Sequence, residues 1–164
     1  MKRRLSVIIG SLALFLMFFA PSGFAQAEET ECECPGTVIT GAERNQLVAD
    51  LLKSDEFKTV KKDLMKDGYK WKGAGAIEVR DFSNLESSVL LELLGIPEST
   101  ELYGLLINMN TAEILEFLEI TSFPSMIYQV LFLDEAGTLQ GAGFSLVNGQ
   151  LIYGGVFPVE AHQH

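Results

Sequence analysis

Residues Met126–Phe157 constrain the fold of this chain more than any other stretch, because three apolar runs alternate there with two turn sequences. The runs and turns are Ile127–Leu133, Asp134–Gly137, Thr138–Val147, Asn148-Gly149 and Leu151–Phe157. Asn-Gly is the strongest short hairpin signal, and β-branched and aromatic residues favour strands. The stretch therefore predicts a three-stranded antiparallel meander. Its first strand is apolar on both sides, so it should be central or covered by a helix.

Residues 40–68 have the apolar spacing of a helix or helix pair. Thr40 and Glu43 fit a capping box, and Ser54 can restart a second helix after a short break. Gly68 is a candidate C-terminal cap. The apolar stripe consists of Leu47, Leu51, Phe57, Val60 and Leu64.

The middle of the chain mixes strand and helix signals. Trp71–Gly75 is expected to be a flexible joint, and Ala76–Phe82 alternates like an edge strand. A helix is expected after Ser83, with Glu86 completing a second capping box and Gly95 and Pro97 ending it. Leu102–Met109 has the length of a strand, whereas Ala112–Glu119 is expected to be helical.

These elements predict an α+β fold, with an N-terminal helix or helix pair packed on an antiparallel sheet that ends in the three-stranded meander. The sheet would include the Ala76 and Leu102 strands. The expected organisation is a signal peptide (1–27), a flexible tail with a Cys-x-Cys pair (28–39) and a single α+β domain (40–164).

The first 27 residues have the pattern of a secretory signal peptide. Lys2-Arg3-Arg4 precedes the apolar run Leu5–Ala20, and Ala25-Gln26-Ala27 is a cleavage triplet. Cleavage would leave a secreted or extracytoplasmic protein without a stable membrane span, exposed to an oxidising compartment.

Charge is distributed unevenly along the chain. Of 12 Lys and Arg, three leave with the signal peptide, so the mature chain has 9 against 22 acids, a net charge of −13. All nine lie between Arg44 and Arg80, and eleven acids follow from Asp81 onward without a single Lys or Arg. This distribution disfavours nucleic acid and anionic lipid, and it favours cations, a cationic peptide or protein, or simple solubility.

Two smaller clusters are candidate sites. Glu113, Glu116 and Glu119 are spaced to share one helical side, which makes them a candidate acidic face as well as an ordinary solvated one. Cys32 and Cys34 could form a strained, easily reduced disulfide or a redox site. The neighbouring Glu31 and Glu33 would raise the thiol pKa and lower its reactivity.

Other chemistry has little support in the sequence. Cys32 and Cys34 with His162 and His164 would give four zinc ligands, but the spacing is not typical of zinc sites, so no metal site and no cofactor are predicted. No nucleophile has a base at a characteristic spacing, and the prediction is that the chain is not an enzyme.

Gly41–Tyr69 resembles the helical N-terminal module of secreted bacteriocin-like or halocin-like precursor proteins of Gram-positive bacteria. The residues that match are the Gly-x-Glu-Arg-Asn start, the Leu-Leu-Lys-Ser-Asp-Glu-Phe-Lys centre and the Asp-Gly-Tyr end. In those precursors a Cys- and Gly-rich toxic peptide follows the module, whereas no cysteine follows Cys34 here. The resemblance therefore implies a companion that binds or masks a peptide.

The predicted function is a secreted, non-enzymatic binding protein of propeptide or immunity type for a cationic peptide. The alternative is a redox or metal accessory protein of the cell envelope that uses Cys32 and Cys34. The sequence leaves the oligomeric state open.

Overall fold

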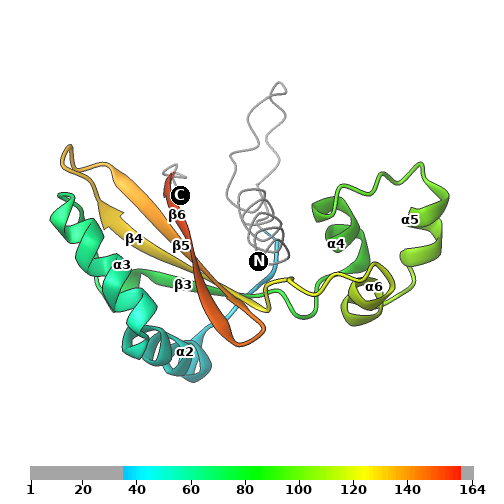
Figure 1. Ribbon diagram of the computed structural model, residues 1–164, viewed down its shortest axis with the longest axis horizontal. Helices are drawn as coiled ribbons and strands as arrows, with labels where there is room; N and C mark the ends of the chain where they lie inside the picture. The colour runs from blue at the N-terminus through cyan, green and yellow to red at the C-terminus, as the bar shows by residue number, and fades with distance from the viewer. Residues whose placement is uncertain (1–34, 160–164) are drawn as a thin grey trace, which may run out of the picture. The chain divides into compact units, whose positions relative to one another are not determined.

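The computed structural model describes residues Pro35–Val159, which form an α+β fold with a helix pair packed on a six-stranded antiparallel sheet (Figure 1). The predicted fold class is confirmed. The strands are β1 (Thr37–Val38), β2 (Lys70–Trp71), β3 (Ile77–Asp81), β4 (Met126–Leu133), β5 (Leu139–Val147) and β6 (Gln150–Pro158). The helices are α2 (Gly41–Lys53), α3 (Asp55–Lys66), α4 (Ser87–Leu93), α5 (Glu101–Leu106) and α6 (Thr111–Phe117), with a 3-10 turn, η1, at Ala74–Ala76.

The sheet is built around β4. Its order is β1-β3-β4-β5-β6, and β2 pairs with the end of β4 that lies beyond β3. The predicted meander and the central position of its first strand are therefore confirmed. Ile77–Asp81 is a strand as expected, but it is not the edge, because the two residues of β1 lie outside it.

Both turns of the meander use the predicted residues. Asn148 and Gly149 have φ of 50° and 74°, as a tight two-residue hairpin requires, and Gly137 has a φ of 80° in the first turn. Asp134 accepts hydrogen bonds from the Thr138 backbone N–H at 2.8 Å and from Gln140 Nε2 at 3.1 Å. These bonds, above all the one from Thr138, lower the pKa of the Asp134 carboxyl, because they favour its charged form.

The helix pair forms as the sequence predicts, with one wrong cap. Ser54 separates the helices, and its Oγ accepts a hydrogen bond from the Phe57 N–H at 3.2 Å. Gly68 follows the end of α3 with a φ of 91°, and the Tyr69 N–H donates to the Leu64 oxygen, which completes a Schellman motif. The capping box at Thr40 and Glu43 is wrong, because the Thr40 side chain makes no capping hydrogen bond.

The helix pair and one face of the sheet enclose the larger hydrophobic core. Phe57 of α3 packs against Phe144 of β5 and Trp71 of β2, with ring centroids 5.6 Å and 6.1 Å apart. Cross-strand pairing continues this layer, since Val130 lies opposite Ile77 on one side and Ala142 on the other. All three of these residues are buried.

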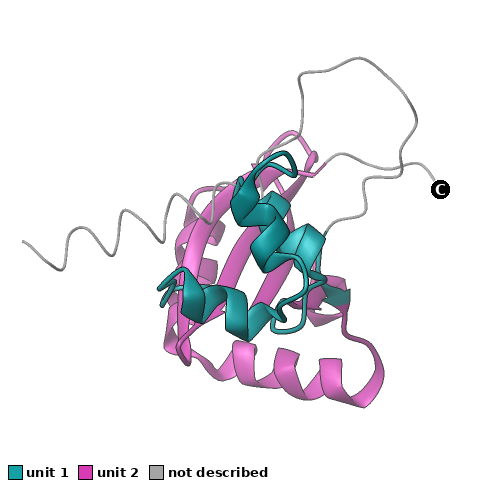
Figure 2. Cartoon of the chain, turned by 90° about the vertical axis from the view of Figure 1, so that its right-hand side faces the viewer, with its two compact units in different colours: residues 1–37, 82–123 teal, residues 38–81, 124–164 magenta. Residues whose placement is uncertain are grey.

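Residues Phe82–Phe123 fold into the other compact part of the described chain (Figure 2). We call the part that contains this segment unit 1, and the part containing Val38–Asp81 and Pro124–Val159 unit 2. Unit 1 has its own core, in which Leu90, Leu91, Leu106 and Ile114 are fully buried. Whether residues 40–164 unfold as one domain stays a prediction, because two packing units can still unfold cooperatively.

The predicted strand at Leu102–Met109 is wrong, since Glu101–Leu106 is the helix α5. Thr100 explains the difference: its Oγ1 accepts a hydrogen bond from the Tyr103 N–H at 3.1 Å and caps the helix. The helix buries Leu106 in the core of unit 1. The expected capping box at Ser83 and Glu86 is also wrong, because Glu86 is itself the N-cap residue and makes no side-chain capping bond.

The last turn of α6 places a side chain in an unfavourable backbone conformation. Glu119 has a φ of 54°, and the Ile120 N–H donates to the Leu115 oxygen at 2.8 Å in a Schellman motif. Glycine normally occupies this position, because the left-handed region costs other residues about 1–2 kcal/mol.

Glu119→Gly is therefore expected to raise the free energy of unfolding by about 0.5–1 kcal/mol, after the entropy cost of glycine is subtracted. Urea denaturation followed by circular dichroism measures the change. The matched control Glu116→Gly lies within α6 and should lower stability by about 1 kcal/mol. A destabilised Glu119→Gly variant would contradict the assignment of strain.

Gly141 of β5 leaves room for a ring of the neighbouring strand. A Cβ atom there would overlap the ring of Phe157 and approach Val159 Cγ2 at 3.0 Å. Gly141→Ala is expected to lower the free energy of unfolding by about 1–3 kcal/mol, as overpacking does. Gly75→Ala is the control, because no atom lies within 4 Å of a Cβ at that position. Equal stability of the two variants in thermal unfolding would refute the close approach.

Candidate functional site

Unit 1 contains an open groove of about 530 Å³ between α4, the turn that follows it and α5. We call it the acidic groove. Its lining residues are Ser88, Val89, Glu92, Gly95, Ile96, Pro97, Glu98 and Tyr103. Val89, Ile96 and Pro97 supply apolar surface, while the exposed side chains of Glu92 and Glu98 supply negative charge. A ligand that fits this groove combines a positive charge with apolar groups.

Local sequence signals fix the walls of the acidic groove. Gly95 follows α4 with a φ of 70°, and the Ile96 N–H donates to the Leu91 oxygen at 2.9 Å. Thr100 then joins the turn to α5, because its Oγ1 donates to the Pro97 oxygen at 2.7 Å while accepting from the Tyr103 N–H. The groove is therefore shaped by two adjacent helix ends.

The whole Phe82–Phe123 segment shares the negative charge of the acidic groove. The segment has seven glutamates and no Lys, Arg or His. It also exposes the large apolar side chains of Leu102, Leu105 and Phe117, which are 38%, 56% and 51% accessible. Acidic and apolar surface together are the complement of an amphipathic cationic peptide.

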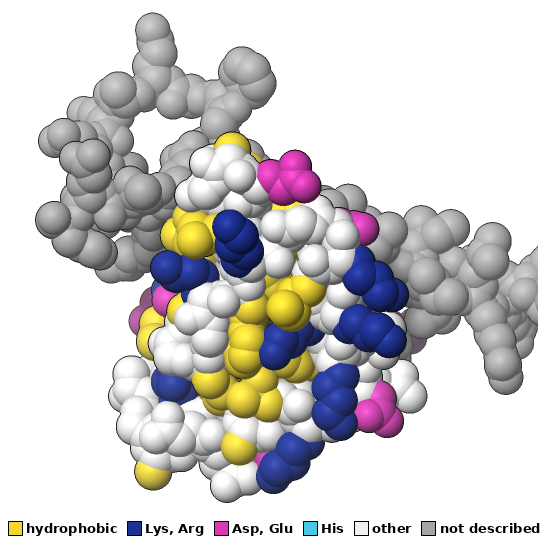
Figure 3. All heavy atoms as spheres, turned by 90° about the vertical axis from the view of Figure 1, so that its left-hand side faces the viewer, with side chains coloured by type: hydrophobic (Ala, Val, Ile, Leu, Met, Phe, Trp, Pro, Cys, Tyr) yellow, Lys and Arg dark blue, Asp and Glu magenta, His cyan; other side chains and the backbone are white. Residues whose placement is uncertain are grey.

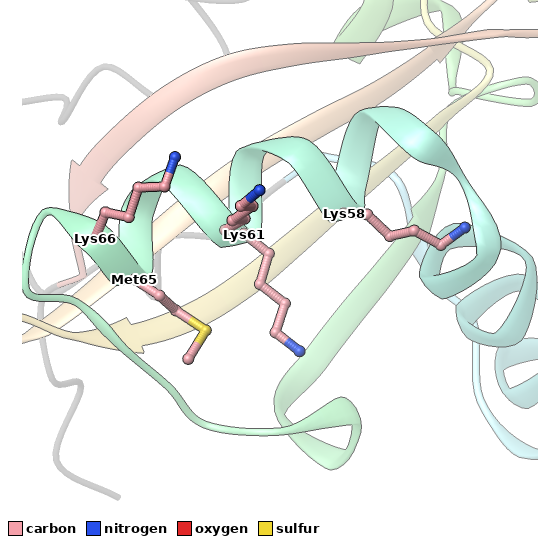
Figure 4. A pocket seen from close by; sticks show the side chains of 5 residues that line it. Lys58, Lys61, Met65 and Lys66 are labelled. Atoms are coloured by element: carbon pink, nitrogen blue, oxygen red, sulfur yellow. The ribbon is translucent and has the colours of Figure 1, made fainter.

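Unit 2 contains a surface of opposite charge along the outer side of α3. An open hollow of about 450 Å³ is lined by Lys58, Lys61, Lys62, Met65 and Lys66 (Figure 4). We call these five residues the lysine face. Figure 3 shows hydrophobic side chains gathered on this side of the molecule, with Lys and Arg side chains around them.

The lysines of this face differ in their partners. Lys58 and Lys66 form exposed ion pairs with Asp55 and Asp63, at 3.2 Å and 2.9 Å. Lys61 Nζ lies 3.5 Å from the centroid of the Trp71 ring, a cation–π geometry. Within residues 35–159, Lys62 forms no ion pair, and the buried indole Nε1 of Trp71 has no hydrogen-bond partner.

Arg44 fastens the segment that was expected to be a flexible joint. Its Nη2 donates to the oxygens of Ala74, Gly75 and Ile77 at 3.0, 3.1 and 2.6 Å, and its Nε donates to Ile77 at 3.0 Å. Trp71 is in addition paired with Phe132 of β4. The segment is thus an ordered turn, and the expectation of a joint is wrong.

The three glutamates predicted as an acidic face occupy different backbone positions on and after α6. Glu113 belongs to a capping box at the start of α6, where its carboxylate accepts a hydrogen bond from the Asn110 N–H at 2.9 Å. Glu116 lies within α6, and Glu119 follows its end in the left-handed conformation. All three side chains are exposed, and their use in binding stays a prediction.

The predicted cysteine chemistry lies outside the described residues, because Cys32, Cys34, His162 and His164 are not among Pro35–Val159. The disulfide, redox and zinc alternatives therefore stay predictions. Within the described range, no group of three or more His, Cys, Asp or Glu side chains is placed to hold a metal ion. The helices of that range are also too short or too polar to cross a membrane.

Comparison of the chain with protein-family models, with curated proteins and with solved structures gives no match. The resemblance of Gly41–Tyr69 to bacteriocin-like precursors remains a prediction from its residues.

Sequence reasoning missed the positions of two residues, Arg44 and Tyr103. Arg44 lies in the first turns of α2, where a cation opposes the helix dipole, and this conflict was a signal that its guanidinium binds elsewhere. Tyr103 belongs to an apolar run whose length predicts a strand, so the sequence does not indicate its place in a groove with Glu92 and Glu98.

Arg44 donates to three backbone oxygens, so its contribution to the free energy of unfolding should depend on the planar shape of the guanidinium group. Arg44→Lys keeps the charge but loses the planar fork, and we expect the free energy of unfolding to fall by about 1–3 kcal/mol. Urea unfolding measures it. Lys53→Arg, at an exposed position of α2, is the control and should change stability by no more than about 0.5 kcal/mol. An unaffected Arg44→Lys variant would show that the fork is dispensable.

Proposed function

We propose that this protein is a secreted or extracytoplasmic, non-enzymatic binding protein of propeptide or immunity type, whose ligand is a cationic, amphipathic peptide. The observation that carries the proposal is the acidic groove, where Glu92 and Glu98 flank apolar surface in a segment without any basic residue. The negative charge and apolar surface of this groove support the proposal.

The chemistry of the groove favours a peptide over a small cation. Glu92 and Glu98 are exposed, so each contributes little to affinity alone and mainly steers an oppositely charged partner. Apolar side chains of the ligand can cover Val89 and Ile96, and a Lys or Arg side chain can lie over the ring of Tyr103. The expected binding is therefore salt-dependent but not purely electrostatic.

The test uses the mature chain and a synthetic amphipathic helix of Leu and Lys, with the same peptide carrying Glu in place of Lys as the reference ligand. Isothermal titration calorimetry should detect the Lys peptide alone. Glu92→Gln combined with Glu98→Gln should weaken its binding about five- to tenfold, because two favourable charge pairs are lost.

The matched control is Glu116→Gln combined with Glu119→Gln, which removes the same charge from the same unit outside the groove. Its binding should fall less than twofold. A larger loss in this control than in the groove variant would place the peptide on the α6 side instead. Equal binding of the Lys and Glu peptides would overturn the proposed function.

A further inference from the structure

The proposed peptide ligand does not bind the lysine face. It presents four lysines, and Met65 between them is 52% accessible. Exposed apolar surface rimmed by charged side chains is a feature of interaction sites. The acidic groove is lined by other residues, so a ligand of this second surface would bind separately from the peptide.

The charges of this face are available to a partner. Lys62 has no ion pair within residues 35–159, and the pairs of Lys58 and Lys66 with Asp55 and Asp63 are solvent-exposed. Exposed pairs of this kind contribute little, so a lysine can exchange its carboxylate for another anion at small cost. Lys61 is already held over the Trp71 ring, which leaves one ammonium group in a fixed position.

The shape of the face favours a surface over a small ligand. The hollow is open, and Figure 4 shows the Lys58, Lys66 and Met65 side chains on the outer side of α3 rather than around an enclosed cavity. Lysine side chains can lay their aliphatic stems along apolar surface while the ammonium groups reach polar headgroups. Met65 would then enter the boundary between headgroups and acyl chains.

We propose that the lysine face docks the protein on a lipid surface with anionic headgroups. Charge complementarity favours an anionic partner. The exposed Met65 favours a lipid surface over a soluble polyanion, because a polyanion would leave this apolar side chain in water. Single-stranded nucleic acid fits less well, because base stacking needs a free aromatic face and Lys61 covers the one that Trp71 offers. The negative net charge of the chain is screened beyond about 8 Å at physiological salt, so the local lysines decide at contact.

The test measures co-sedimentation of the mature chain with vesicles of phosphatidylglycerol mixed with phosphatidylcholine, and with vesicles of phosphatidylcholine alone. Binding is expected to the anionic vesicles only and should weaken as salt is raised. Lys62→Gln should weaken it about fivefold, the contribution of one lysine near an anionic surface. Lys53→Gln is the matched control, because Lys53 lies on α2 outside the lysine face, and should have a smaller effect.

Met65→Ser separates a lipid surface from a soluble polyanion. It should weaken vesicle binding about fivefold and leave binding to soluble polyphosphate unchanged, because only the bilayer takes up the apolar side chain. Absence of binding to anionic vesicles, or vesicle binding that does not change in Met65→Ser, would overturn the proposal. These results are independent of the groove variants, since the two surfaces share no residue.

Discussion

The contact between Phe57 and Phe144 is the interaction on which most of unit 2 depends. It joins the first turn of α3 to the middle of β5, and both rings are fully buried. Ser54 holds the Phe57 backbone N–H, so the helix break and the core contact are set within three residues of each other. Once Phe57 points inward, the helical period directs Leu64 inward as well and leaves the lysine face outside.

The same packing connects the core to the surface chemistry. Trp71 lies edge-on to Phe57 and receives Lys61 on its ring, so one aromatic side chain belongs both to the core and to the basic surface. Arg44 holds the turn that follows β2 through backbone oxygens alone. Because backbone oxygens are present whatever side chains the turn carries, the small residues at 73–76 are sufficient for these hydrogen bonds.

The sequence was most informative where local chemistry alone decides the structure. Asn148-Gly149, Ser54 and Gly68 each determine their own turn or cap, and the structure has all three where they were expected. The strand prediction for Leu102–Met109 is wrong because an apolar run of that length suits either a strand or a buried helix. Only the Thr100 cap distinguishes the helix from the strand here. The acidic groove could not be predicted for the same reason, since one of its walls is that helix.

The two charged surfaces follow from where the chain places its basic residues. Every Lys and Arg of the described chain lies in Arg44–Arg80, within unit 2, and Phe82–Phe123 of unit 1 has none. Lys58 and Lys66 on α3 form ion pairs with acids one turn away. The glutamates of Phe82–Phe123 have no basic residue in their own segment. A partner with positive charge is thus attracted to one unit and repelled by the lysine face of the other. The two proposals therefore assign the cationic ligand and the anionic surface to different units.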